Sequence, residues 1–186
     1  MMMAATIIIP MCNQAITDAD KLSKISEAKR AASELAAGLN RVYAMGPGSS
    51  LTVEYSLPDR VLTTCLGGYE NLDADGIVTA DETVPINGCA DIQILMDLNG
   101  DGMWDNLRDS VVIVDTILPS RWNEDGTERG EEWVKENCVH VEEQNLKIGP
   151  EHNTLSKRTF HQTTFIYCYD PSNQYPHRIV VLDEIR

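Results

Sequence analysis

The stretch from Ile16 to Ser50 constrains the fold of this chain more than any other part of the sequence. Its apolar residues recur at alternating steps of three and four, which places them along one narrow seam of an α-helix. Alanines beside the seam would let a neighbouring helix approach closely. The pattern therefore predicts a helix whose seam packs against copies of itself from other chains. The seam residues are Ile25, Ala28, Ala32, Leu35, Leu39 and Val42.

The predicted helix ends near Met45, because Gly46-Pro47-Gly48 follows. Glycine adopts positive φ easily, and proline has no N–H to continue the helical hydrogen bonds. After this break the hydrophobic period changes to two, which indicates strands. Residues 51–57 and 60–65 are expected to form a β-hairpin around a Pro58-Asp59 turn. Further strands are predicted at 91–96, 111–118, 138–143, 158–169 and 178–183, and a short helix is predicted at 128–137.

These patterns predict an α+β fold with two parts. At 186 residues the chain is long enough to bury one good core. Residues 1–46 are expected to form a long N-terminal helix, and residues 47–186 an antiparallel, β-rich, sandwich-like head. A chain that starts near Ser50 is expected to keep its β-fold without the helix.

The junction between helix and head resembles that of a known family. It runs LNRVYAMGPGSS from Leu39 to Ser50, continues LTVEY, and reaches Leu57-Pro58. This resembles the helix-to-head junction of archaeal type IV pilins, where an Ala-rich helix ends in Asn-x-Val-Tyr, Gly-x-Gly-Ser-Ser and Thr-Val before the first strand. The match covers about the first third of the chain. The resemblance implies an extracellular filament subunit that polymerises through its helices and attaches to surfaces or other cells.

The first twelve residues, MMMAATIIIPMC, are wholly apolar. They are shorter than the ~20 residues needed to span a bilayer. The family pattern has a short basic leader and a longer apolar start, so this segment departs from it. Either the chain begins after processing, or residues are missing upstream of Met1. In the filament interpretation, contact with a membrane is expected only before assembly.

The formal net charge is −14, and all of this negative excess lies after residue 50. Such a surface repels nucleic acid and attracts divalent cations. We therefore expect no nucleic-acid partner. Between Glu70 and Asp115 the only basic residue is Arg108, and bound cations would relieve the repulsion in that stretch.

The sharpest chemical signal is DLNGDGMWD, which runs from Asp97 to Asp105. Oxygen ligands at alternate positions, with a sharp turn at Gly102, can wrap one hard cation, and calcium fits. The loop resembles the calcium loops of integrin-type repeats and dockerins, although Arg108 stands where an EF-hand has Glu. The alternative is a solvated acidic turn. The candidate ligands are Asp97, Asn99, Asp101, the carbonyl of Met103, Asp105 and Asp109.

A second candidate calcium loop covers residues 71–82. It reproduces much of the EF-hand pattern, including a glycine at Gly76 and a terminal Glu82, but neither flank is helical. The alternative is an ordinary turn rich in Asp and Asn. The candidate ligands are Asn71, Asp73, Asp75, Ile77 and Glu82.

Four of the five cysteines lie in the head: Cys65, Cys89, Cys138 and Cys168. An even number suits two disulfides in an oxidising, extracellular setting. Cys65–Cys89 and Cys138–Cys168 are the expected pairs, the first because it brackets the 71–82 loop. The alternative is that all the cysteines are reduced core residues of a cytosolic protein.

No nucleophile elbow, phosphate loop, dinucleotide fingerprint or His-Glu-x-x-His motif occurs in the sequence. We therefore expect no enzyme. The leading hypothesis is a structural subunit of an extracellular, pilus-like adhesive filament with a head stabilised by calcium and disulfides. Two alternatives stay open. One is a monomeric, membrane-anchored calcium-dependent adhesin or carbohydrate-binding module, and the other is a secreted hydrolase that uses head carboxylates.

Overall fold

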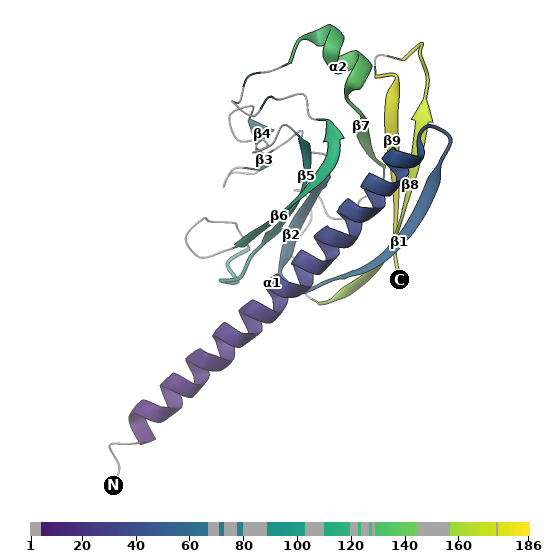
Figure 1. The fold of residues 1–186 in the computed structure, drawn as a ribbon. Coiled ribbons are helices and arrows are strands. Elements are labelled where there is room, and N and C mark those ends of the chain that lie inside the picture. The colour runs from purple at the N-terminus through teal and green to yellow at the C-terminus, as the bar shows by residue number, and fades with distance from the viewer. Residues whose placement is uncertain are drawn as a thin grey trace.

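The computed structural model spans residues 1–186 and describes residues 5–66, 71–72, 78–79, 89–102, 110–119, 123, 127, 129–144, 157–173 and 175–186. One long helix is followed by a β-rich head, which confirms the predicted α+β class (Figure 1). The elements are α1 (Ala5–Met45), β1 (Ser50–Leu57), β2 (Val61–Leu66), β3 (Asn71–Leu72), β4 (Val78–Thr79), β5 (Cys89–Met96), β6 (Ser110–Pro119), α2 (Glu131–Asn137), β7 (His140–Gln144), β8 (Thr159–Tyr169) and β9 (His177–Ile185).

The helix ends where the glycines allow it to end. Gly46 has a φ of 83° and Gly48 a φ of 88°, both in the left-handed region that favours glycine. The Ser49 hydroxyl donates to the carbonyls of Val42 and Gly46, at 3.0 and 2.7 Å. The Gly48 N–H then donates to the Tyr167 carbonyl at 2.8 Å, which ties the turn directly to β8.

The head contains a four-stranded sheet, in the order β1-β8-β9-β7, and a three-stranded sheet, in the order β2-β5-β6. All neighbours in these two sheets are antiparallel except β7 and β9, which run parallel. The predicted hairpin of β1 and β2 is wrong. At Pro58-Asp59-Arg60 the chain crosses from one sheet to the other, and β1 pairs with β8 while β2 pairs with β5. Arg60 holds a φ of 76° in this crossing.

The core forms where α1 closes the space between the two sheets (Figure 1). The helix packs mainly against β1 and β6, the edge strands of the two sheets. Leu35, Leu39 and Val42 are fully buried there. Each such side chain contributes roughly 1.5–3 kcal/mol through its removal from water. The Asn40 side chain accepts a 2.8 Å hydrogen bond from the backbone N–H of Ile117, so it pairs one open backbone group of β6.

The helix and the strands share this single core across residue 46. Ala28, Ala32, Leu35, Leu39 and Val42 all lie in one cluster with residues of both sheets. Removing α1 would expose the inner faces of β1 and β6. The expectation that a chain starting near Ser50 keeps its fold stays a prediction, and the shared core argues against it because the helix supplies part of the head's core.

Candidate functional site

The part of α1 that precedes the core extends away from the head (Figure 1). Residues 14–20 are all exposed, and Ile16 and Leu22 are each 68% exposed. Ala15, Ile16, Ala19 and Leu22 follow one another at helical steps that place them on one side of the helix. These four residues form an apolar stripe that no other part of the described chain covers. The polar residues Thr17, Asp18 and Lys21 lie around it.

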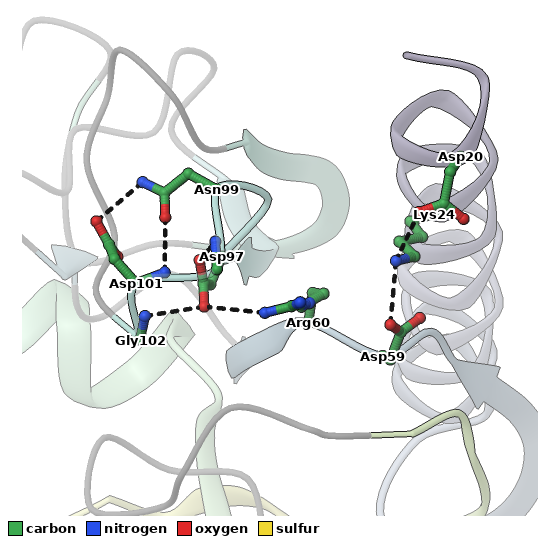
Figure 2. A network of polar contacts seen from close by, with 9 residues as sticks. Asp20, Lys24, Asp59, Arg60, Asp97, Asn99, Asp101 and Gly102 are labelled. Carbon is green, nitrogen blue, oxygen red and sulfur yellow. Dashed lines mark hydrogen bonds and ion pairs between the residues drawn. The ribbon is translucent and has the colours of Figure 1, made fainter. Parts of the chain in front are cut away.

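Polar contacts mark the point where α1 leaves the head. The Lys24 ammonium lies 2.8 Å from Asp20 and 3.0 Å from Asp59 in the β1–β2 crossing (Figure 2). Burial alone would lower the pKa of Lys24, but the two carboxylates hold that pKa above its usual value. One turn further on, Glu27 accepts a hydrogen bond from Ser56 at 2.8 Å and pairs with Arg158 at 2.6 Å. We call Lys24, Glu27 and their partners the collar.

The predicted assembly seam lies on the other side of the collar. Ala28, Ala32, Leu35, Leu39 and Val42 are each 0% exposed against the chain's own sheets, and Ile25 is partly buried against the same core. The prediction that this seam contacts other chains is therefore wrong. Its heptad-like spacing encodes packing within the chain, because a narrow apolar stripe fits the gap between two sheet edges as well as it fits another helix.

The Asp97 loop is described as far as Gly102. Asp97 is 1% exposed, and its two carboxylate oxygens accept backbone N–H groups from Gly100 at 2.5 Å and Gly102 at 3.0 Å. Arg60 lies on the other side of this carboxylate, with 3.9 Å between Nη1 and Oδ2 (Figure 2). The Asn99 oxygen accepts the Asp101 N–H at 2.8 Å, and the Asn99 amide donates to Asp101 at 3.0 Å. The structure thus gathers three of the predicted oxygen ligands in one tight turn.

Most of the other predicted ligands fall where the structure gives no description. Met103, Asp105 and Asp109 lie outside the described residues, as do Asp73, Asp75, Ile77 and Glu82. Asn71 is in β3, where it pairs with Thr79 of β4. Among the residues that the structure describes, no three His, Cys, Asp or Glu side chains gather as a metal site. Calcium binding at both loops stays a prediction.

The two predicted disulfides are not supported. Cys138 and Cys168 are both thiols, so their predicted bridge is wrong. Cys168 is on β8, Cys138 directly precedes β7, and β9 lies between these strands. Two strand spacings of about 4.8 Å exceed the Cα separation that a disulfide allows. Cys65 is opposite Gln93, four residues along β5 from Cys89, and roughly 13 Å of strand likewise separates that pair.

Sequence reasoning missed a buried polar network on the inner face of the four-stranded sheet. His161 Nδ1 lies 2.8 Å from Asp183 Oδ2, and His161 Nε2 lies 2.8 Å from the Thr159 hydroxyl. The Thr163 hydroxyl donates to the other oxygen of Asp183, and the Tyr55 ring stacks on His161 with centroids 5.1 Å apart. Burial, together with the charge of Asp183, raises the pKa of Tyr55 well above its usual value.

The His161 and Asp183 side chains are both 0% exposed. This network joins β1, β8 and β9 through satisfied hydrogen bonds and fixes their alignment. The signal that could have revealed it is the alternation of Thr159, His161 and Thr163 on the same side of β8 as the apolar Phe165.

Comparison with known protein families, curated proteins and solved structures finds no match to this chain. No helix in the described part of the chain has both the length and the hydropathy that a membrane crossing requires. The arrangement of the helix around the collar is therefore the main guide to function.

Proposed function

We propose that this chain is a structural subunit of an extracellular, pilus-like filament used in surface adhesion. The observation that carries the proposal is the division of α1 at the collar. After Glu27 the helix packs against the head. Before Lys24 it presents an exposed apolar stripe of Ala15, Ile16, Ala19 and Leu22. Burying such a stripe against other helices is favourable at about 25 cal/mol per Å².

Two further features support an assembly role for this helix end. The helix also includes residues 5–13, whose sequence ATIIIPMCN is mostly apolar, so further apolar sequence directly precedes the exposed stripe. The family resemblance at residues 39–58 also covers the turn that joins helix and head. In the proposed filament the outer parts of the helices bundle, and the heads cover the outside with their acidic surface.

Calcium binding by the Asp97 loop is part of the proposal. Backbone N–H groups already hold the Asp97 carboxylate in place, and Asn99 and Asp101 add oxygen atoms in the same turn. A cation that binds only the folded form must raise the melting temperature. We expect the wild-type chain to melt higher in calcium than in chelator, and we expect Asp97→Asn to reduce that difference. Equal melting in both solutions, with the metal content measured as zero in chelator, would contradict this part.

Electron microscopy of the full chain tests the filament directly. We expect the wild type to form filaments with helices at their centre, and we expect Leu22→Asp to prevent them. The matched control is Ala37→Asp, which places the same charge at an exposed position of α1 on the head side of the collar.

Ala37→Asp should assemble like the wild type, and all three proteins should unfold at similar denaturant concentrations. A wild-type chain that stays monomeric at every concentration would contradict the filament proposal. A monomer that binds vesicles or glycans would instead favour the anchored adhesin.

A further inference from the structure

A pair of aspartates faces each other in the three-stranded sheet, away from α1. Asp91 of β5 is directly opposite Asp115 of β6. Their neighbours Ile92 and Val114 belong to the core beneath α1, so the alternation of a strand places both carboxylates on the other face. Like charges directly opposite each other destabilise a sheet. Asp115 is exposed and its side chain shares a hydrogen bond with Asp91, so one proton or one cation between the two carboxyl groups relieves this repulsion.

Asp91 cannot relieve this repulsion by turning into water. It is only 8% exposed. Within the described part of the chain, its Oδ1 is a buried oxygen with no hydrogen-bond partner. A buried carboxylate oxygen without a partner carries a desolvation cost of about 1–3 kcal/mol or more. By contrast, Asp183 in the other sheet has Thr163, Tyr55 and His161 around its two oxygens. Among the described residues, the Oδ1 atom of Asp91 thus differs from both oxygens of Asp183, because it accepts no hydrogen bond.

We propose that Asp91 and Asp115 together bind a divalent cation on this face of the three-stranded sheet. Carboxylate oxygens suit hard cations such as Ca²⁺, Mg²⁺ and Mn²⁺. Gln93, which is 7% exposed, lies two residues along the same face of β5 and can supply a further oxygen, and water would complete the coordination. The site is separate from the Asp97 loop, which follows the opposite end of β5.

The electrostatics of the pair agree with a site for positive charge. Burial, and then the charge and hydrogen bond of Asp115, raise the pKa of Asp91 to about 7. A pair that retains a proton near neutral pH is a pair that a cation can occupy in place of that proton. The net charge of −14 raises the local concentration of cations around it.

Counting bound Mn²⁺ by electron paramagnetic resonance tests the proposal on the full chain at pH 7.5. All proteins carry Asp97→Asn, so that the loop proposed above does not contribute and its success or failure cannot decide the result. Adding Asp91→Asn should remove one bound Mn²⁺ per chain. Adding Asp115→Asn should weaken that ion by more than the ~10-fold that is typical of losing even an indirect contact to a metal. Ca²⁺ and Mg²⁺ should displace it.

The matched control is Glu184→Gln, which neutralises an exposed carboxylate on β9 of the other sheet and should leave the count unchanged. Because asparagine has the shape of aspartate, the variants should fold, and circular dichroism melting checks that they do. Mn²⁺ should raise the melting temperature of the Asp97→Asn protein and leave that of the Asp91→Asn variant unchanged. An equal ion count with and without Asp91→Asn, in folded protein, would overturn the site and leave the pair as two carboxyl groups sharing a proton.

Discussion

The two parts of α1 on either side of the collar have the same backbone and opposite surroundings. Between Ala28 and Val42 every seam residue is buried between the sheets, while Ile16 and Leu22 are the most exposed large hydrophobic residues among those from residue 14 onward whose exposure the structure describes. Both parts carry apolar residues at helical spacing. The difference shows that spacing predicts which side of a helix is buried but not which surface buries it. Substitutions in the buried part of α1 after Glu27 should therefore lower the stability of the head strongly. Substitutions in the exposed part before Lys24 should hardly change it.

Leu39→Ala should have the largest effect on head stability. Leu39 is 0% exposed, and alanine would leave a cavity beside both sheets. We expect the free energy of unfolding to fall by about 2–5 kcal/mol. Urea denaturation followed by circular dichroism measures this change. A loss below about 1 kcal/mol would mean that the seam is not part of the head's core in solution.

The position of the helix and strands could be predicted from the sequence, but their partners could not. Alternating and helical periods are local, so the C-terminal end of α1 and both ends of β1 and β8 were predicted to within a residue or two. Pairing β1 with β8 depends on residues more than a hundred positions away, and no local pattern encodes it. The wrong prediction of a Cys138–Cys168 bridge has the same cause. Cysteine spacing says nothing about which strand lies between two cysteines.

The same contrast between local patterns and distant partners separates the candidate sites. The Asp97 loop could be predicted because all its oxygen atoms come from one short segment with glycines at fixed places. The Asp91–Asp115 pair and the His161–Asp183 network could not, because each depends on the register between two strands. Cross-strand contacts become visible only when the sheet is formed.

Gly38→Ala should have the second largest effect. A Cβ atom at this position would lie 2.8 Å from the Phe165 ring and 2.9 Å from a Val53 methyl group. Alanine favours a helix over glycine by about 1 kcal/mol. Overpacking of a core costs about 1–3 kcal/mol, so we expect a net loss of stability. The exposed Ser33→Ala is the control and should unfold almost like the wild type. A more stable Gly38→Ala would show that Phe165 and Val53 can move aside.

Glu27→Gln tests the collar itself and should have a smaller effect. Glutamine keeps the shape and can still accept the Ser56 hydrogen bond, but it loses the charge that pairs with Arg158. The Arg158 side chain is 58% exposed, so water weakens the pair, and we expect a loss of roughly 1 kcal/mol. A double-mutant cycle with Arg158→Gln isolates the pair. Additive effects of the two substitutions would show that the collar does not depend on this contact.

Ile16→Ser should have the smallest effect on the head and a large effect on assembly. Ile16 is 68% exposed, and a surface substitution away from caps and buried groups changes the free energy of unfolding by at most about 0.5 kcal/mol. Its apolar surface gains a partner only when chains associate, so its removal should raise the protein concentration at which filaments appear, measured by light scattering. Unfolding in urea must be measured on the same preparation below that concentration. If Ile16→Ser instead destabilises the monomer by 1–2 kcal/mol, then the outer part of α1 is packed within its own chain, and the contrast between the two parts of the helix does not hold.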